Sequence, residues 1–447
     1  FCLFAEDTSI FQPDQFSNFI KEKTAPDGSD LAMHIAELFQ VLNTPPEKRL
    51  ATRDEAVAAF PYVNGNLFGD QLQIPAFSAA MRTALLECGA LDWSKISPAI
   101  FGAMFQGVMD ETKRHDLGAH YTSEENILKV IRPLFLDRLR EEFDTICLLT
   151  GPSKRVKLQQ FHDRIAALKF LDPACGCGNF LLIAYRELRR LEMDVLEELH
   201  KDDPGMVLDV STLCKVNVSQ FYGIEIEQFP AEIAKVALWL MDHLCNLEVA
   251  DRFGQYFARI PIKASPHIVC ANALTTDWAT LSPSFDYIFG NPPFLGGMWT
   301  SPEQKADMAA VFGAKQKMLG ELDFVTAWFK KSSDLIKGTG TRCAFVATNS
   351  ITQGQCVPVL GRALDVEIDY AYRTFKWHNE AKDNAAVHCV IIGFHAANHG
   401  GTGVSPVQGE VVREILDLIA PKTRLVRVDH DPDAVDIAAA PVLVAGG

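Results

Sequence analysis

The chain has 447 residues, of which 48% are hydrophobic and 22% are charged, and its formal net charge at pH 7 is -15. A chain this long with this much apolar content can bury a large core, so it is globular rather than disordered. The acidic balance excludes a simple basic nucleic-acid-binding module, but not an enzyme that meets nucleic acid through a local basic groove. No uncharged apolar run of about 18 residues occurs, so no transmembrane helix is predicted.

The eleven cysteines indicate a reducing compartment, because most lie inside apolar runs, as Cys147 and Cys343 do. Such cysteines behave as small hydrophobic residues, and we therefore expect a cytoplasmic protein. Cys175 and Cys177 lack a second pair at zinc spacing and lie in a glycine-rich turn, where small residues are needed. We predict that both pack in the core and that the chain has no metal site. The start at Phe1, without a basic leader, indicates the interior of a longer protein rather than a signal peptide.

The first 150 residues or so show helical periodicity. The amphipathic stretches are Leu31–Leu42, residues 75–86 and residues 98–109. Residues 122–125, Thr-Ser-Glu-Glu, match a capping box, with a hydroxyl at the cap and a carboxylate three residues on. They predict a helix over residues 123–143 that bends near Pro133.

From about residue 168 the pattern changes to alternating strands and helices. This alternation predicts an α/β fold with a doubly wound, mostly parallel Rossmann-like sheet, preceded by the α-helical region. The predicted strands are residues 169–172, 221–226, 267–271, 285–289, 343–348, 368–373 and 387–394. The predicted helices between them are residues 180–200, 231–247 and 323–336. Residues 398–447 carry only weak signals, and no element is predicted there.

The tetrapeptide Asn291-Pro292-Pro293-Phe294 directly follows a predicted buried strand. Such a turn can aim the amide oxygen of Asn291 and the rigidly held carbonyl of Pro292 at one point. Two converging acceptors suit a planar –NH2 group, because they bind its protons and direct its nitrogen lone pair toward an electrophile. The ring of Phe294 can stack on the flat group that carries the amine. Alone, however, Asn-Pro-Pro is usually only a turn.

The second motif is Asp-Pro-Ala-Cys-Gly-Cys-Gly, residues 172–178, between a predicted strand and a helix that starts near Asn179. A parallel sheet binds its ligand beyond the carboxyl ends of its strands, where the strand order reverses. Gly176 and Gly178 let the backbone pass close to such a ligand. The turn is shorter than a dinucleotide fingerprint, which favours S-adenosylmethionine, a molecule without a pyrophosphate, over NAD. The two motifs together predict an amino-group methyltransferase.

Two further residues are candidates for the donor site. Glu225 closes the second predicted strand, where a carboxylate can accept hydrogen bonds from both ribose hydroxyls. It lies much farther from the glycine turn than the roughly 20 residues of the dinucleotide fingerprint, so a surface acid is the alternative. Asn272 follows the third predicted strand and can reach the adenine amine.

The order of these motifs resembles a known group. Residues 118–122, Gly-Ala-His-Tyr-Thr, resemble the segment that precedes the fold in gamma-type DNA adenine methyltransferases and contacts the methionine part of the donor. The glycine turn, Glu225, Asn272 and Asn291 then follow in that group's order. Closer still, residues 1–10 and 376–382 resemble the MmeI-like enzymes, which combine restriction and modification in one chain.

This resemblance, which covers roughly residues 1–395, implies a domain organisation and a reaction. It implies a helical connector over residues 1–117 and a methyltransferase domain over residues 118–395, and it leaves residues 396–447 unassigned. The implied reaction is methylation of the N6 amino group of adenine in double-stranded DNA. The parent protein would add an N-terminal nuclease and a C-terminal target-recognition domain.

The motifs and the resemblance together give a set of expected site residues. Residues 291–294 are expected to be catalytic. The residues expected to bind the cofactor are Ala119, Tyr121, Thr122, Asp172, Ala174, Gly176, Gly178, Phe180, Glu225, Ile226, Asn272, Ala273 and Asn291. A base in a duplex must leave the stack to reach such a site. Phe294 and Trp377, the latter expected in a loop between two late strands, would contact the flipped base.

Other functions fit parts of the sequence. A protein-glutamine or ribosomal-RNA amino methyltransferase is one, since a side-chain amide is also a planar –NH2 group. A non-catalytic binding protein with a vestigial fold is another, although the intact Asn291 and glycine turn argue against it. Asp369 with Glu380-Ala381-Lys382 superficially matches a nuclease metal site. That triplet lies between two late strands of the predicted sheet, which argues against a nuclease.

Overall fold

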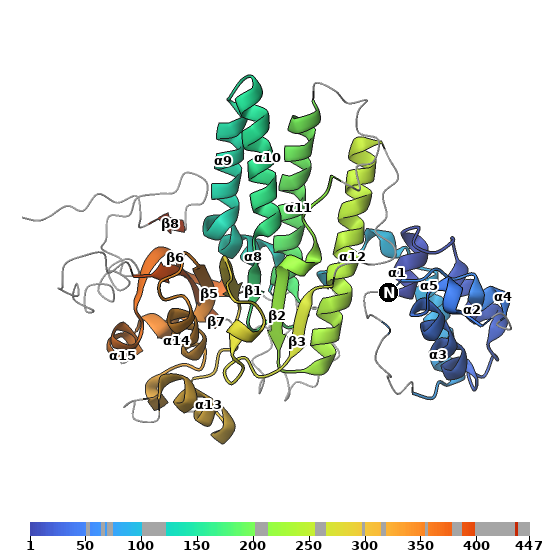
Figure 1. Cartoon of the computed structure of the whole chain (residues 1–447). Coiled ribbons are helices and arrows are strands. Elements are labelled where there is room, and N and C mark those ends of the chain that lie inside the picture. The colour runs from blue at the N-terminus through green and yellow to red at the C-terminus, as the bar shows by residue number, and fades with distance from the viewer. Residues whose placement is uncertain are drawn as a thin grey trace, which may run out of the picture.

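The structure, a computed structural model, describes most of the chain. The described residues are 1–50, 54–63, 68, 75–100, 122–201, 213–254, 265–296, 300–313, 319–353, 356–377, 387–397 and 434–436. They form a helical N-terminal region followed by an α/β region (Figure 1). The predicted fold class is therefore confirmed. None of the described helices is long and apolar enough to cross a membrane.

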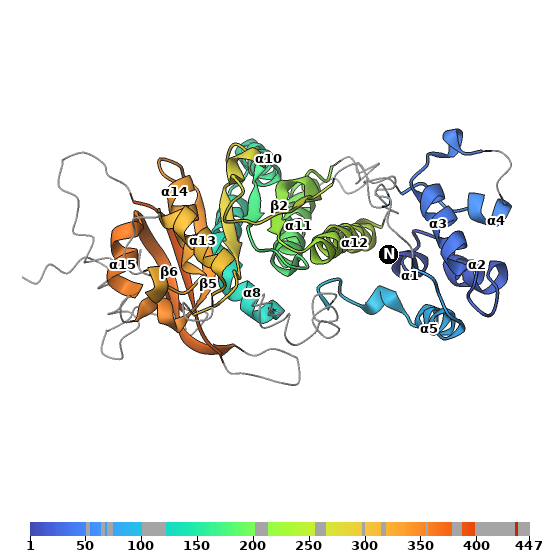
Figure 2. The same cartoon turned by 90° about the horizontal axis from the view of Figure 1, so that it is seen from below.

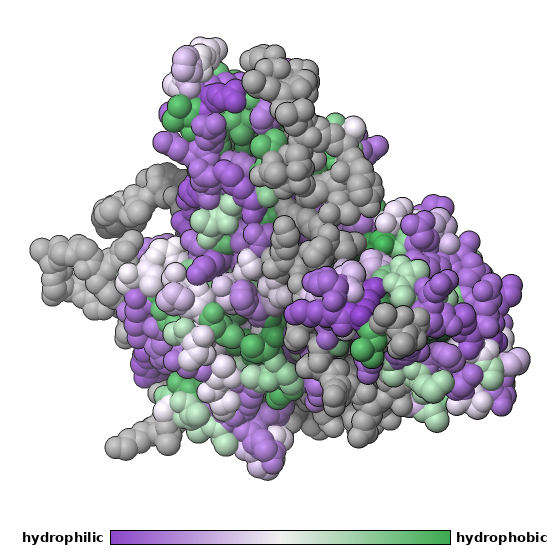
Figure 3. All heavy atoms as spheres, turned by 45° about the vertical axis from the view of Figure 1, so that its right-hand side comes forward, coloured by the Kyte–Doolittle hydropathy of each residue, from purple (hydrophilic) through white to green (hydrophobic). Residues whose placement is uncertain are grey.

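The N-terminal region consists of short helices around a core of its own. Its α-helices are α1 (Cys2–Asp7), α2 (Gln15–Lys23), α3 (Leu31–Leu42), α4 (Glu55–Ala58) and α5 (Ala79–Gly89). Helix α3 has the predicted bounds and buries Leu31, Ile35, Leu38 and Leu42, which recur at helical spacing. The face of the region that Figure 3 shows is mainly hydrophilic.

Two other predicted helices of this region compare differently with the structure. Helix α5 begins four residues later than predicted, because the Ser78 hydroxyl accepts a hydrogen bond from the Met81 amide and caps the helix there. The helix predicted over residues 98–109 lies almost wholly outside the described residues. The region contacts the next one through the Nε2–H of His243, which donates to the Thr8 carbonyl at 2.8 Å.

The α/β region begins with a helix close to the predicted one. Helix α8 (Glu124–Ile131) continues through a π-helical turn, Arg132–Leu136, into α9 (Asp137–Cys147). The irregular turn contains Pro133, which has no amide hydrogen to donate, and it lies where the bend was predicted. The predicted capping box is wrong, because Ser123 is the N-cap but its side chain makes no capping hydrogen bond.

All the predicted strands are present, and among the described residues they belong to one sheet of eight strands. The strands are β1 (Phe170–Asp172), β2 (Phe221–Glu225), β3 (His267–Cys270), β4 (Tyr287–Gly290), β5 (Arg342–Thr348), β6 (Val366–Trp377), β7 (Val387–Ala396) and β8 (Ala434–Asp436). Their order is β3-β2-β1-β4-β5-β7-β6-β8, and the first five are parallel, while β7 runs antiparallel between β5 and β6. Strand β8 comes from the segment for which no element was predicted, and it pairs with β6.

Helices cover both faces of the sheet (Figures 1 and 2). One layer holds α8, α9, α10 (Pro152–Ala167), α11 (Asn179–His200) and α12 (Gln228–Phe253). The other holds α13 (Pro302–Phe312), α14 (Thr326–Leu335) and α15 (Cys356–Ala363). Neighbouring strand residues alternate between the two cores: Phe170 and Phe289 join the first, whereas Leu171 and Ile288 join the second. This period of two lets a nearly continuous apolar strand fill both cores.

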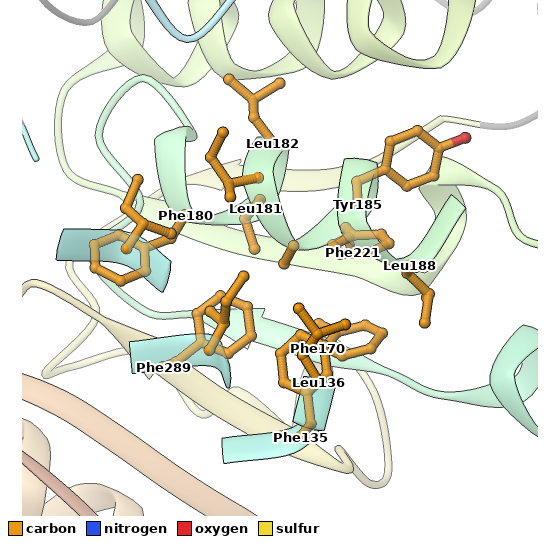
Figure 4. Close-up of a cluster of buried hydrophobic side chains, with 14 of the residues drawn as sticks. Phe135, Leu136, Phe170, Phe180, Leu181, Leu182, Tyr185, Leu188, Phe221 and Phe289 are labelled. Carbon is orange, nitrogen blue, oxygen red and sulfur yellow. The ribbon is translucent and has the colours of Figure 1, made fainter. Parts of the chain in front are cut away.

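Aromatic rings from the central strands, the π-helical turn and α11 gather in the first core (Figure 4). Phe170 of β1 stacks on Phe221 of β2 with ring centroids 4.8 Å apart and planes 10° apart. The ring centroid of Phe135, from the π-helical turn, lies 5.1 Å from that of Phe170. Such pairs contribute about 0.5–1.5 kcal/mol beyond their burial. The packing fixes the helices that carry the site to the strands that end there.

Candidate active site

The strand order reverses at β1, which has β2 on one side and β4 on the other. The loops that leave β1 and β4 therefore emerge next to each other, at the place where such sheets bind ligands. Their closeness is visible at Gly290, where an added Cβ would overlap the carboxylate of Asp172. The two sequence motifs, more than a hundred residues apart, meet at this point.

The turn that follows β1, residues 172–178, is called the β1 turn. Its two glycines, Gly176 and Gly178, have different surroundings. Both adopt left-handed backbone angles, with φ of 53° at Gly176 and 86° at Gly178. A Cβ at Gly176 would meet no described atom within 4 Å, so this side of the turn is open to a ligand. A Cβ at Gly178 would lie 3.0 Å from the Cβ of Ala234 in α12. Gly178 is therefore needed for helix packing, while Gly176 lines the open side.

Glu225 is built into this turn. Its Oε2 accepts a hydrogen bond from the Gly176 amide and its Oε1 accepts one from the Glu227 amide, both at 3.0 Å. A carboxylate has about four acceptor positions, so about two are left for hydroxyl groups of a ligand. Burial raises the pKa of Glu225 above its ordinary value. The carboxylate is thus a fixed acceptor at the end of β2, not a mobile surface acid.

Asp172, the last residue of β1, is only 1% exposed. Its Oδ1 accepts a hydrogen bond from the Ala174 amide at 3.0 Å. Burial, with a smaller contribution from the charge of Glu225, raises the pKa of Asp172 to about 8. In the free protein at neutral pH this carboxyl group is therefore mainly protonated.

A cationic ligand would favour the ionised form of Asp172, which gives a pH dependence with a definite sign. Below the pKa of about 8, binding must release a proton. We expect the affinity for S-adenosylmethionine to rise with pH up to about 8 and then to level off, with a slope of up to tenfold per pH unit. Calorimetry in two buffers of different ionisation enthalpy measures the proton release.

The Asp172→Asn variant is the control for this pH dependence. With that variant the amino group of the ligand still titrates, but residue 172 does not. The difference between the two proteins isolates the contribution of Asp172. An affinity difference that stays constant between pH 6 and 8 would contradict the expected proton release.

Asn291 follows β4 with its amide in a defined orientation. Its Nδ2 donates to Thr122 Oγ1 at 3.1 Å, and Thr122 is only 4% exposed. Its Oδ1 is buried and has no hydrogen-bond partner among the described residues. The Oδ1 of Asn179, the first residue of α11, is in the same state. Buried polar atoms are nearly always paired, so these two oxygens indicate a ligand that brings its own donors.

The hydrogen-bond donors and the positive charges of S-adenosylmethionine fit these residues. The molecule carries a positive sulfonium, an ammonium group, ribose hydroxyls and an adenine amine, all of which favour acceptors or anions. The residues around the turn offer the Oδ1 of Asn179, which has no partner among the described residues, the fixed carboxylate of Glu225 at the end of β2 and the titratable carboxyl of Asp172. The open side of Gly176 leaves room for the ligand against the backbone.

The aromatic residues predicted to hold the base lie in two places. Phe294 is partly buried and packs against the edges of both hydrophobic cores, at the junction between them. Trp377 was expected in a loop, but it is the last residue of β6, where it pairs with Val387. The strand runs farther than predicted because its pairing with β7 continues beyond a register shift after Tyr372.

The remaining predicted cofactor residues differ in exposure and contacts. Ile226 is 55% exposed and Ala174 is half-buried beside the turn. Phe180 and Ala273 are buried in the two cores. Asn272 is already engaged: its Oδ1 accepts from the Leu274 amide at 2.9 Å, and its Nδ2 donates to Asp307 Oδ2 at 2.8 Å. Ala119 and Tyr121 lie outside the described residues.

The cysteine pair and the nuclease-like residues show different surroundings. Cys175 and Cys177 are buried, and burial raises the pKa of Cys177 to about 12, so its thiol stays protonated. The Oδ1 of Asp369 in β6 lies 3.2 Å from Nη1 of Arg342 and 2.9 Å from Nδ1 of His395. Residues 380–382 lie outside the described part of the chain. Within the described part, no cluster of metal-binding side chains occurs.

The four residues 291–294 that follow β4 are called the β4 motif. The role of Asp323 beside this motif was not found from the sequence. Its Oδ1 accepts from the amides of Leu295 and Val325, and its Oδ2 accepts from Thr348 Oγ1 at 2.6 Å. It therefore ties the residue after Phe294 to the end of β5. No local pattern marks this role, because its partners lie 28 and 25 residues away in the chain.

Lys331 of α14 was also missed. Its ammonium group donates to the carbonyls of Ala273 and Leu274 at 2.7 and 2.8 Å. It thereby holds the loop that follows β3 and carries Asn272. In the sequence, Lys330-Lys331 has the pattern of an ordinary charged helix face.

Family models and known proteins match most of this chain. A family model described as MmeI, DNA-methyltransferase domain matches residues 150–403, and one described as MmeI, helicase spacer domain matches residues 1–68. DNA methyltransferase A of Bacillus subtilis (strain 168) is 42% identical over 403 residues, which is 88% of this chain and 44% of that protein.

A solved structure, that of the Type IIL restriction-modification enzyme MmeI in complex with DNA, is 55% identical with a TM-score of 0.84. The match covers 88% of this chain and 52% of that chain. The chain thus spans about half the length of these relatives. The methyl donor of the matched domain is S-adenosylmethionine, as the glycine turn predicted. Because the methyltransferase model matches more than half of its residues, the chain belongs to the MmeI DNA-methyltransferase domain family.

Proposed function

We propose that the chain transfers the methyl group of S-adenosylmethionine to the exocyclic N6 amino group of adenine in double-stranded DNA. The observation that carries the proposal is the buried Oδ1 of Asn291 at the end of β4, which has no hydrogen-bond partner among the described residues. It lies beside the β1 turn, where the donor fits. An acceptor of this kind binds an amine hydrogen and leaves the nitrogen lone pair directed at the methyl group.

The residues of the β4 motif share the reaction. Asn291 Oδ1 and the Pro292 carbonyl each accept one hydrogen from the target amine, and Pro293 keeps the turn rigid. When bound, S-adenosylmethionine supplies an electrophilic methyl group on a positively charged sulfur. The amine can lose its extra proton to water after the transfer, so no side chain with a tuned pKa is needed as a general base.

Donor binding is assigned to the ends of β1, β2 and β3. Glu225 binds the ribose hydroxyls, Asp172 compensates the positive charge, and Gly176 gives the backbone access. Ile226 and Asn272 lie at the adenine end. The other proposed contacts are Ala119, Tyr121, Thr122, Ala174, Gly178, Phe180 and Ala273.

We also propose that the domain acts on double-stranded DNA within a longer cytoplasmic protein that cuts and modifies DNA. In that protein a nuclease would precede residues 1–117, the helical connector, and a target-recognition domain would follow the methyltransferase domain, residues 118–395. The solved MmeI structure, determined in complex with DNA, supports a DNA partner. The acidic net charge of this chain requires that DNA be met by a local basic surface.

The proposal is tested by supplying isotopically labelled donor together with DNA, RNA or protein. Mass-resolved mapping of modified bases, in DNA from cells that express the full-length protein, identifies the product. We expect N6-methyladenine at one sequence. Label in protein glutamine or in RNA would establish the alternative amino-group methyltransferase, and N4-methylcytosine would move the target to another base. Tight donor binding without any transfer would favour a vestigial fold.

Phe294 is proposed to stack on the flipped adenine, with Trp377 as a further contact. Base–aromatic stacking contributes roughly 1–3 kcal/mol. We expect Phe294→Ala to weaken binding to intact duplex DNA by about tenfold or more, and to weaken binding less when the target position is abasic or mismatched. Fluorescence of 2-aminopurine at the target position reports flipping. A full fluorescence rise in the Phe294→Ala protein would remove Phe294 from this role.

A further inference from the structure

An asparagine amide can assist methyl transfer in only one of its two orientations. The oxygen and the nitrogen have nearly the same shape, but the oxygen accepts hydrogen bonds whereas the nitrogen donates them. A target amine also brings hydrogens, so it meets an acceptor when Oδ1 faces it and a repulsive donor when Nδ2 faces it. The orientation in which the Asn291 amide is held therefore decides whether it can assist the transfer.

The contact that holds the Asn291 amide in the structure is the one with Thr122. Asn291 Nδ2 donates to Thr122 Oγ1 at 3.1 Å, while Asn291 Oδ1 stays buried without a partner among the described residues. The two residues are 169 positions apart in the chain. With Thr122 only 4% exposed, water competes little for its hydroxyl group. In the structure this bond anchors the amide with Nδ2 on the Thr122 side and with Oδ1 left for the amine.

The position of Thr122 is fixed by helix α8, which begins two residues later. Glu124 in its first turn forms an ion pair with Arg186 of α11 at 2.6 Å. Farther along, the Val130 carbonyl accepts a hydrogen bond from the Tyr370 hydroxyl of β6 at 2.6 Å. Ile127 is buried in the core beneath α8. The helix is thus held by both α11 and the sheet, and Thr122 is held with it.

We propose that Thr122 is a positioning residue that keeps the Asn291 amide oxygen directed at the target amine. The inference rests on the proposed function, because it assigns Asn291 its acceptor role. It gives Thr122 a task beyond the contact with the donor's methionine part that the family resemblance implied. Pre-orientation of this kind acts on the methyl-transfer step, since a fixed acceptor needs no reorganisation as the reaction begins.

The test compares Thr122→Val with Thr122→Ser. Valine keeps the shape of threonine but has no hydroxyl group, whereas serine keeps the hydroxyl. We expect Thr122→Val to lower kcat about tenfold, with the donor Kd and the DNA KM changed less than about twofold. Thr122→Ser is expected to restore most of kcat. The matched control is Thr8→Val, another buried threonine, which loses its bond to the Phe4 carbonyl far from the site.

Each outcome decides between roles. An unchanged kcat in folded Thr122→Val overturns the positioning role, and so does a serine variant as slow as the valine variant. A donor affinity that falls as much as kcat would mean that the Thr122 hydroxyl acts on the donor, not through Asn291, and also overturns the positioning role. If the wild-type protein transfers no methyl group to DNA while it binds the donor, the proposed function itself fails, and the inference fails with it.

Discussion

Replacing Asn291 by alanine is expected to lower kcat for methyl transfer by about 10²–10³-fold, the range seen when one fixed hydrogen-bonding group at a reacting centre is removed. The substitution removes the acceptor that faces the target amine. It leaves the carboxylates of Asp172 and Glu225 and the open side of Gly176 unchanged, so the affinity for S-adenosylmethionine is expected to stay within about twofold of wild type. Single-turnover transfer of labelled methyl groups and calorimetry measure the two quantities.

The same substitution is expected to cost little stability. It removes one hydrogen bond to Thr122, but it also removes a buried acceptor that has no partner in the part of the chain that the structure describes. These contributions are of similar size, about 1 kcal/mol each, and oppose one another. Asn217→Ala is the control, because it removes the cap of the turn Val218–Gln220 outside the site and should lower stability without lowering kcat. Substantial methylation by the Asn291→Ala protein would sink the catalytic assignment.

Replacing Gly176 by valine is expected to abolish measurable binding of S-adenosylmethionine, with a loss of about 100-fold or more. The valine side chain would occupy the side of the turn that is free of described atoms and open to the donor. It would also force a β-branched residue to a φ of 53°, a backbone conformation that glycine adopts without strain but a β-branched residue does not. Calorimetry with the purified variant measures the affinity.

Backbone strain must be separated from loss of the ligand site. Gly254→Val is the matched control, since Gly254 has a φ of 64°, no described atom within 4 Å of an added Cβ, and a place at the end of α12. Both variants should lose similar stability, about 1–3 kcal/mol. Only Gly176→Val should lose the donor. Unchanged affinity in a folded Gly176→Val protein would mean that the donor binds elsewhere.

The sequence predicted the strands well, because each central strand is an almost continuous apolar run bounded by polar or glycine-rich turns. The runs at β1, β2, β4 and β5 were placed within two residues of their observed bounds. Strand β8 was not predicted, since its three residues are a strand only through pairing with β6. Helix α13 was also missed, although Ser301 and Gln304 form a capping box at its start.

The sequence by itself determined the two motifs and their order, because glycine, proline and asparagine have conformational and hydrogen-bonding properties that can be judged locally. Tertiary structure alone decided which atoms meet. The pairing of β1 with β4 brings Asp172 against Gly290, and the clamping of α8 brings Thr122 to Asn291. Asp323 reaches Leu295 in the same way. Such contacts join residues far apart in the chain, and their partners are set by strand order and helix packing, which no local pattern records.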